Sequence, residues 1–292
     1  MKSRIKLPLV SICIPTYNSE TTIRKTLKSI LNQTYKNFKI FIVDNASTDN
    51  TVKIIKSFKK KKIKIHKFKK FLQAEENWSR CIKLSDGDYT AIYHSDDVYD
   101  KDIILKQVCF LEKNLKCGAV FTEGSLIDIN NKFIKKIKVP VKKKSDNFNY
   151  NYIEVFEKLA KDFNFLICPS AMVRTKIYKN YIKKFNFKNF GSSSDLDAWL
   201  RILEKYDIGI IKQNLISYTI SEKQQTTQTR QFKNLPIFFK VMEKQFKKKK
   251  IRDNKFKEDF QILKSYIFLF LIIGSMQNQL NNNLNILYKK FY

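Results

Sequence analysis

Asp96 and Asp97 are adjacent carboxylates that directly follow an apolar stretch, residues 89–93, typical of a buried strand. Open α/β sheets bind ligands beyond the carboxyl ends of their strands, and paired acids at that edge can hold a hard divalent cation against a diphosphate. Serine and aspartate also favour solvated turns and helix caps, so the pair taken alone is open to that interpretation. The order of the surrounding elements favours the metal site.

Strand and helix signals alternate at short intervals through the first half of the chain, which predicts βαβ units and a mostly parallel sheet. Short apolar runs indicate the strands, and apolar residues at helical spacing indicate the helices between them. On the first of these helices, Arg24, Lys25 and Lys28 lie on the side opposite the apolar residues, which is expected to face solvent. Asp44 ends the second strand, so it also lies at a carboxyl end. The expected strands are residues 9–14, 38–43, 63–68 and 89–93. Three helices are expected between them: one capped by Ser19, one that starts before Val52, and one over residues 75–84.

The second half of the chain has looser patterns. Residues 130–152 are rich in Lys and Asn and are interpreted as a mobile connection. The tail from about residue 228 is basic and is expected to be helical, and its apolar run 266–273 is shorter than the roughly 20 residues that span a bilayer. That run indicates a core or dimer-interface helix, or docking at a membrane interface. The other expected elements are helices over 104–114, 152–161 and 195–205 and strands over 119–123 and 208–211.

The composition is that of a globular protein, since 43% of the 292 residues are apolar. The N-terminus shows no signal-peptide cleavage pattern, so we expect a cytoplasmic protein. The cysteines are odd in number and form no CxxC pair, which indicates reduced, mostly buried thiols rather than a zinc site or a disulfide framework. They are Cys13, Cys81, Cys109, Cys117 and Cys168.

A formal net charge of +30 would suit a nucleic acid or an anionic membrane surface as partner. Only seven of the 57 basic residues are arginine. Proteins that read base edges depend on the planar fork of arginine, and no nucleic-acid-binding motif is present, so we expect no nucleic-acid partner. Attraction to an anionic membrane remains consistent with the charge.

Four short motifs follow one another over roughly the first 125 residues. They are Ile14-Pro15-Thr16-Tyr17-Asn18, Val43-Asp44-Asn45-Ala46-Ser47-Thr48-Asp49-Asn50-Thr51, Gly87-Asp88-Tyr89 and Asp96-Asp97. Each is weak alone, but in this order and spacing they closely resemble family 2 glycosyltransferases of the GT-A fold. Residues 194–201 resemble the acidic motif that precedes a Trp-Leu-Arg helix in that family, which extends the resemblance to about 220 residues.

The resemblance implies a GT-A type α/β fold, with a mostly parallel central sheet flanked by helices and a helical C-terminal extension. It also implies transfer of a sugar from a nucleotide-diphosphate donor to an acceptor hydroxyl, with inversion at the anomeric carbon. Departure of the nucleoside diphosphate concentrates negative charge on phosphate oxygens, which bound Mg²⁺ or Mn²⁺ would stabilise.

Matching positions in the motifs imply the site residues. Asp97 would hold the metal, Asp96 would contact the metal and the donor ribose, and Asp44 would accept a hydrogen bond from the base. Arg80 on the third helix could approach the donor, or could be a solvated helix residue. The nucleoside pocket would be lined by Pro15, Thr16, Tyr17 and Asn18.

An inverting displacement needs a base that removes the proton of the acceptor hydroxyl. Asp195 matches the acidic position of the family motif, although an aspartate there could also serve as a helix N-cap. Asp197 comes two residues later and would point elsewhere on the helix. Trp199 could shape the acceptor pocket or belong to the core.

The chain departs from the family pattern at three places. His94 stands where Asp is frequent, so the metal site would depend chiefly on Asp97. Ser194 stands where Glu is common, which leaves Asp195 as the only base candidate there. Residues 218–221 replace a frequent Tyr-Arg-x-His pattern, and Lys223 or another lysine could supply the missing charge.

The function implied is that of an inverting glycosyltransferase that uses a nucleotide-sugar, with a UDP-sugar favoured and dTDP- and GDP-sugars left open. The acceptor would be a glycan or lipid-linked saccharide in the assembly of bacterial cell-surface polysaccharide or lipopolysaccharide. Two other functions are considered. A sugar nucleotidyltransferase would show a Gly-rich loop after the first strand, which residues 15–18 do not contain. The other is a non-catalytic protein with a degenerate glycosyltransferase fold that binds a glycan or a partner protein, which would account for the departures from the family pattern.

The expected organisation is a GT-A domain over residues 1–225 and a basic helical extension over 226–292. Within the domain, residues 1–123 would bind the nucleotide-sugar and residues 124–225 would form the acceptor side. The extension could mediate a homodimer or hold the enzyme peripherally at the inner face of the membrane.

Overall fold

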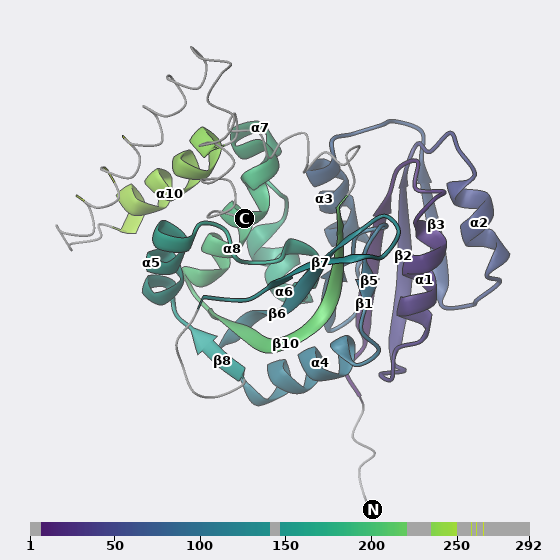
Figure 1. Cartoon of the computed structure of the whole chain (residues 1–292), viewed down its shortest axis with the longest axis horizontal. Helices are drawn as coiled ribbons and strands as arrows, with labels where there is room; N and C mark the ends of the chain where they lie inside the picture. The colour runs from purple at the N-terminus through teal and green to yellow at the C-terminus, as the bar shows by residue number, and fades with distance from the viewer. Residues whose placement is uncertain are drawn as a thin grey trace, which may run out of the picture.

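The computed structural model describes residues 7–140, 147–220 and 235–249, together with the single residues 258, 261 and 265. Within this part of the chain, ten strands form one sheet in the order β3-β2-β1-β4-β9-β6-β10-β5, with β7 paired to β6 and β8 paired to β10. Helices cover both faces of the sheet (Figure 1). The fold is therefore the α/β type expected from the sequence.

The N-terminal half alternates strands and helices as expected. Its four strands are parallel, because β1 pairs with β2 and β4, and β2 pairs with β3. Their carboxyl ends therefore meet at one edge of the sheet. The elements are β1 (Val10–Thr16), α1 (Ile23–Leu31), β2 (Phe38–Asn45), α2 (Thr51–Ser57), β3 (Ile63–Phe68), α3 (Ala74–Leu84) and β4 (Tyr89–Ile92).

The second half adds antiparallel pairings, through which β9 joins β4 to β6. The two long strands β6 and β10 run parallel. The larger elements are β5 (Val98–Tyr99), α4 (Ile103–Lys113), β6 (Cys117–Asp128), β7 (Phe133–Ile137), β8 (Asn147–Tyr150), α5 (Tyr152–Asp162), β9 (Met172–Arg174), α8 (Ser194–Leu203), β10 (Asp207–Ile220) and α10 (Leu235–Lys249). Short helical segments lie between them: η1 (Cys168–Ser170), α6 (Thr175–Ile177), η2 (Tyr178–Ile182), α7 (Phe187–Phe190) and η3 (Gly191–Ser193).

Two hydrophobic clusters lie on the two faces of the sheet. Alternate residues of a strand point to opposite faces, so Ile12 packs with Leu27 of α1 while Cys13 packs with Ile82 of α3. Helices α1, α2 and α4 contribute to the first cluster, and α3, α5, α8 and α10 contribute to the second. The sheet is thus the middle layer between two helical layers.

Several sequence expectations need correction. Residues 130–152 are not simply a loop, because they contain β7 and β8. The strands expected over 119–123 and 208–211 are much longer, since β6 and β10 pair along most of their length. Ser19 does not cap α1, which begins at Ile23 after a turn. β1 continues through Pro15, because beyond Cys13 it pairs with β2 alone and the missing N–H is tolerated.

The C-terminal expectations are only partly covered by the structure. Helix α10 lies in the expected extension and packs against α8 (Figure 1). Lys223, the apolar run 266–273 and the rest of the extension lie outside the described residues. No helix in the described part of the chain is long and apolar enough to cross a membrane. All five cysteines are free, and Cys13, Cys81 and Cys117 are buried, as expected.

Candidate functional site

The carboxyl ends of β1 and β2 place Thr16 directly beside Asp44, both buried. Thr16 Oγ1 donates to Asp44 Oδ1 over 3.3 Å, and the backbone N–H of Ser47 donates to Asp44 Oδ2 over 3.3 Å. These contacts fix the direction of the Asp44 carboxylate. A buried carboxylate held at the end of a strand is suited to accept a hydrogen bond from a ligand that enters at this edge.

The loops after β1 and β2 are joined to each other through Asn18. Its side-chain Oδ1 accepts from the backbone N–H of Thr48 over 2.8 Å, and its own backbone N–H donates to Ser47 Oγ over 3.1 Å. Asn18 has a φ of +45°, in the left-handed region that asparagine tolerates better than most residues. We infer that Asn18 shapes the rim of the pocket through the backbone.

Tyr17 and Phe71 form an aromatic pair at the same edge. Their ring centroids are 4.7 Å apart, and the two residues are 48% and 46% exposed. Half-exposed aromatic rings beside a pocket can stack on a planar base. Pro15, the other residue expected here, lies within β1 opposite Val43 of β2 and is only partly exposed.

Arg80 of α3 is engaged within the protein. Its Nη1 donates to Asn45 Oδ1 over 2.9 Å and to Asn77 Oδ1 over 3.2 Å, and its Nη2 donates to the Lys70 carbonyl over 3.0 Å. The guanidinium also lies 4.0 Å from the ring centroid of Phe68. In this arrangement Arg80 holds the segment between β3 and α3, which carries Phe71, against the end of β2.

His94, Asp96 and Asp97 come together after β4. One potential ligand atom from each lies within 4.8 Å of the other two. Asp97 is fully buried, and its Oδ1 accepts the backbone N–H of Thr219 over 2.8 Å. Its Oδ2 lies 3.8 Å from His94 Nδ1, and among the described residues neither Oδ2 nor His94 Nε2 has a hydrogen-bond partner.

This donor set fits a divalent cation. Burial, followed by the nearby charge of Asp96, raises the pKa of Asp97 well above its ordinary value, and burial lowers the pKa of His94. The raised pKa of Asp97 reflects a buried carboxylate whose negative charge a bound cation would compensate, and the lowered pKa of His94 favours the neutral imidazole, the form that binds a metal. Carboxylate oxygens with an imidazole nitrogen suit Mn²⁺, and the carboxylates alone suit Mg²⁺.

His94 and Lys25 are members of this cluster that sequence patterns did not mark as such. His94 stands at a position where the family pattern has a carboxylate, yet its ring points to Asp97 and stacks on Trp78 with centroids 5.4 Å apart. Lys25 was expected on the solvent side of α1. Its Nζ instead donates to Asn131 Oδ1 over 2.9 Å and to Thr219 Oγ1 over 3.4 Å.

Lys25 is a cation close to the acids. Burial lowers its pKa, and the charges of Asp97, Asp96 and Asp128 oppose that shift. Thr219 stands in the segment where the family pattern has an arginine, and its hydroxyl donates to the Asp96 carbonyl over 2.6 Å. Among the described residues, α1 thus brings a lysine, Lys25, beside these acids.

Asp195 lies in the first turn of α8 and is only 7% exposed. Its carboxylate accepts the backbone N–H of Leu196 over 2.7 Å and a hydrogen bond from the Cys168 thiol. Burial raises the pKa of Asp195 to about 6, and these hydrogen bonds oppose the rise. A carboxylate with a pKa near 6 is ionised at neutral pH and is more basic than an exposed one, as a general base requires.

Asp197 and Trp199 contact groups that hold the fold together. Asp197 Oδ2 accepts from Arg201 Nε over 2.9 Å and its Oδ1 accepts from Lys244 Nζ over 2.9 Å, which joins α8 to α10. Trp199 is 1% exposed and packs edge-on against Phe121, with centroids 5.1 Å apart. Asp197 therefore points away from Asp195, as expected, and Trp199 belongs to the core.

Glu75 is a second buried acid near Asp195. It is 4% exposed, and its Oε2 finds no hydrogen-bond partner within the described residues. Burial, with a smaller contribution from the charge of Asp195, raises the pKa of Glu75 to about 7. Acids are common in the first turn of a helix, so the sequence gives no signal for Glu75 and only its burial distinguishes it.

Replacing Glu75 with glutamine should stabilise the ligand-free protein at pH 8. The folded-state pKa of Glu75 lies above its ordinary value of 4.5, so the native protein loses stability as the pH rises from about 4.5 to about 7. Glutamine does not titrate, and the gain should approach about 3 kcal/mol. Urea denaturation of Glu75→Gln, of the native chain and of the exposed neighbour variant Glu76→Gln at pH 5 and pH 8 measures it. An equal difference at both pH values would contradict the assigned titration.

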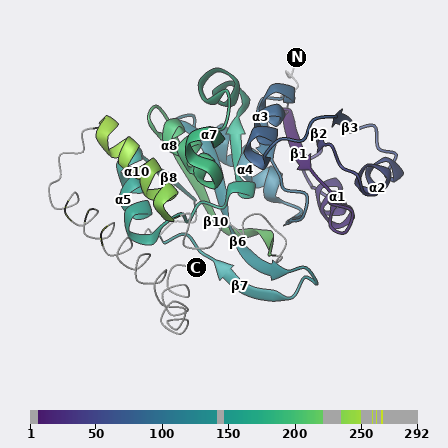
Figure 2. The same ribbon diagram turned by 90° about the horizontal axis from the view of Figure 1, so that it is seen from above.

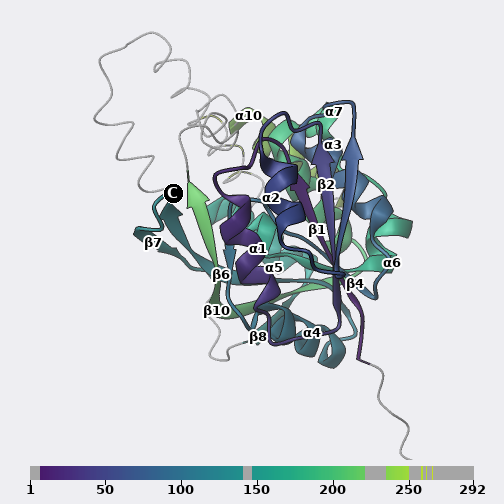
Figure 3. The ribbon, with the colours of Figure 1, turned by 90° about the vertical axis from the view of Figure 1, so that its right-hand side faces the viewer.

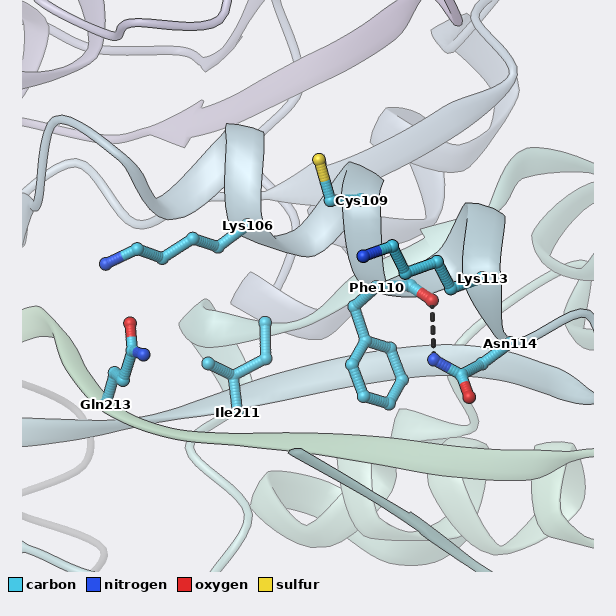
Figure 4. A pocket seen from close by; sticks show the side chains of 7 residues that line it. All are labelled: Lys106, Cys109, Phe110, Lys113, Asn114, Ile211 and Gln213. Atoms are coloured by element: carbon cyan, nitrogen blue, oxygen red, sulfur yellow. Dashed lines mark hydrogen bonds between the residues drawn. The ribbon is translucent and has the colours of Figure 1, made fainter. Parts of the chain in front are cut away.

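A separate pocket of about 400 Å³ lies between α4 and β10 (Figure 4). Its lining includes Lys106, Cys109, Phe110 and Ile211, and none of the candidate residues described above lines it. It is therefore not part of the cluster at the carboxyl edge of the parallel strands.

Comparison with known proteins adds to this geometry. The profile of the family described as Glycosyl transferase family 2 matches residues 11–182. The chain is 31% identical over 232 residues to an uncharacterized glycosyltransferase of Methanocaldococcus jannaschii, covering 76% of this chain and 74% of that protein. It is 27% identical over 229 residues to UDP-Glc:alpha-D-GlcNAc-diphosphoundecaprenol beta-1,3-glucosyltransferase WfgD of Escherichia coli, covering 78% and 82% of the two chains.

A similar fold occurs in a solved structure, residues 1–349 of S. aureus TarS in complex with UDP-GlcNAc. The TM-score is 0.63 at 17% identity, and the match covers 80% of this chain and 66% of that one. At this identity the match concerns the fold, and it agrees with a GT-A type architecture.

Proposed function

The chain belongs to glycosyl transferase family 2 and is a glycosyltransferase, and from that premise we propose that it transfers a sugar from a UDP-sugar to a hydroxyl of a lipid-linked saccharide, with inversion at the anomeric carbon. The product would be an intermediate of a bacterial cell-surface polysaccharide. The observation that carries the proposal is the buried Asp97 carboxylate, which has an unpartnered oxygen beside Asp96 and His94 at the sheet edge that also carries Asp44.

The donor nucleotide is supported by the first two strands. Asp44 would accept a hydrogen bond from the base, and Tyr17 with Phe71 would stack on it. The hydrogen bond from Thr16 that orients the Asp44 carboxylate, and the exposed Tyr17–Phe71 pair, support these roles. A relative whose name specifies UDP-Glc and a similar fold solved with UDP-GlcNAc favour uridine as the nucleoside.

Asp97, Asp96 and His94 would hold a divalent cation beside the donor diphosphate. When bound, Mg²⁺ or Mn²⁺ supplies positive charge that stabilises the departing nucleoside diphosphate. Lys25 would add a second positive charge on the same side, because its ammonium group lies within reach of Thr219 and the acids. In this proposal Thr219 positions Asp97 through the backbone hydrogen bond.

Asp195 would remove the proton from the acceptor hydroxyl as its oxygen attacks the anomeric carbon. The oxygen–carbon bond forms while the bond from that carbon to the diphosphate oxygen breaks, and the proton passes to the Asp195 carboxylate. The acceptor class is supported by the name of WfgD, which specifies a diphosphoundecaprenol-linked saccharide. Residues 1–123 would then bind the donor and residues 124–225 the acceptor.

Nucleoside diphosphate release from UDP-, dTDP- and GDP-sugars, with and without Mn²⁺ or Mg²⁺, tests the proposal. We expect slow, metal-dependent release from a UDP-sugar in the absence of acceptor, and faster release with a diphosphoundecaprenol-linked saccharide. Metal-dependent release confined to another nucleotide would correct the donor. If no nucleotide-sugar were hydrolysed and calorimetry also detected no nucleotide binding, a degenerate binding protein would be the better interpretation.

A further inference from the structure

The turn between β6 and β7 exposes three large apolar side chains. Ile129, Phe133 and Ile134 are 59%, 56% and 50% exposed. The hairpin extends beyond the helical layers at the side of the sheet (Figures 2 and 3). Among the described strands, β7 pairs only with β6.

The start of β7 does not show the burial pattern of a strand that packs on a core. Phe133 and Ile134 begin β7, where its pairing with β6 shifts register between Leu126 and Ile127. Both are exposed, whereas a strand that packs on a core alternates between buried and exposed residues. Exposed apolar groups gathered on a projecting tip indicate a surface that contacts another phase or molecule.

The exposed charges around these apolar groups are positive. Lys132, Lys136 and Lys138 are all exposed. The nearby acids are engaged within the hairpin: Asp128 Oδ1 accepts the backbone N–H groups of Asn130 and Lys132, and Glu123 Oε1 accepts that of Val139. The hairpin therefore presents exposed apolar side chains together with exposed lysines, Lys132 at the tip, Lys136 further along β7 and Lys138 just beyond its end.

The tip is also tied to the candidate active site. Asn131, at the centre of the turn, accepts a hydrogen bond from Lys25, which also reaches Thr219, and Thr219 donates to Asp97. A molecule that binds the tip therefore lies at the rim of the site. Apolar side chains that insert among acyl chains, flanked by lysines that attract anionic headgroups, match a membrane surface.

We propose that the β6–β7 hairpin tip, formed by Ile129, Phe133 and Ile134 with its flanking lysines, inserts into the surface of an anionic lipid bilayer. This places membrane contact on the hairpin, and it does not depend on which sugar or acceptor the enzyme uses. The exposed lysines of two such tips would repel each other, which disfavours a second copy of the chain as the occupant. Bound in this way, the active-site rim faces the headgroup layer.

The experiment uses the full chain with vesicles of phosphatidylcholine, with or without 30% phosphatidylglycerol. A tryptophan introduced by Phe133→Trp reports insertion through quenching by brominated acyl chains. Leu115→Trp is the matched control, because Leu115 is 77% exposed and precedes the opposite end of β6. We expect quenching at position 133 on the anionic vesicles, none beyond the native background at position 115, and loss of quenching at high salt.

The double variant Phe133→Ser/Ile134→Ser should bind anionic vesicles at least about tenfold more weakly in sedimentation, whereas Leu115→Ser should bind like the native chain. Quenching at position 133 no greater than at position 115 would overturn the proposal, even if the chain binds vesicles through another segment. Concentration-dependent association without lipid that the double variant abolishes would assign the tip to a second copy instead. Nucleotide release in solution, measured in parallel, should be unaffected by the double variant, so this test is separate from that of the transferase activity.

Discussion

Asp97→Asn should lower sugar transfer at least about a hundredfold, because it replaces the buried carboxylate that would hold the cation at the leaving group. Asparagine has nearly the same shape and can still accept the backbone N–H of Thr219, so the fold should be retained. The native chain should also gain thermal stability from Mn²⁺, and the variant should lose most of that gain. Steady-state rates and melting curves with and without the metal measure both effects.

Asp100→Asn is the matched control for this variant, because Asp100 is an exposed carboxylate three residues further along the same segment. It should leave the rate and the metal-dependent melting shift unchanged. A fully active Asp97→Asn variant, or equal metal-dependent stabilisation of the variant and the native chain, would remove Asp97 from the metal site. His94→Ala should raise the Mn²⁺ concentration needed for half-maximal rate if the imidazole completes that site.

Asp195→Asn should lower transfer to the acceptor by about 10² to 10⁴, the usual contribution of a general base, while donor binding remains. In the native chain the base works only when ionised, so kcat/KM should fall as the pH decreases through about 6. The residual activity of the variant should lack this fall. Rates between pH 5 and 9, with donor affinity measured by calorimetry, separate loss of chemistry from loss of binding.

Asp197→Asn is the control on the same helix. Asp197 pairs with Arg201 and Lys244 and points away from Asp195, so its variant should melt earlier but keep the native pH profile. If Asp195→Asn retained the native rate and the same fall near pH 6, the proton would be removed by another group. Glu75 would be the first candidate, since it is a buried acid close to Asp195 whose pKa is also raised.

Local sequence patterns determined the first half of this protein well, for two physical reasons. Buried strands and amphipathic helices have distinct apolar periods, so β1 to β4 and the helices between them are recognisable without tertiary information. Parallel strands joined by helices bring their carboxyl ends to one edge, so Asp44, Asp96 and Asp97 could be placed together in advance. The resemblance to family 2 glycosyltransferases then indicated which reaction these acids would serve, the transfer of a sugar from a nucleotide-diphosphate donor.

Only the tertiary structure identified the side chains near the site that are distant in sequence from the acids or whose sequence pattern is ambiguous. The helical period placed Lys25 among solvated lysines, but contact with β10 and the β6–β7 turn directs it to the acids. From the sequence, His94 was interpreted as the loss of a carboxylate from the metal site, whereas the structure places its Nδ1 3.8 Å from Asp97 Oδ2. Burial of Glu75 depends on packing around α3 and α8, which no local pattern encodes.

The sequence by itself therefore determined the α/β fold, the sheet edge that carries the acids and the family of the enzyme. Tertiary structure alone decided which side chains surround those acids, how far the pKa values of Asp195 and Glu75 are raised, and that Ile129, Phe133 and Ile134 are exposed on a hairpin. The physical reason is that short-range periodicity reports which face of an element is buried. Desolvation, charge pairing and exposure at a tip depend on neighbours contributed by remote segments.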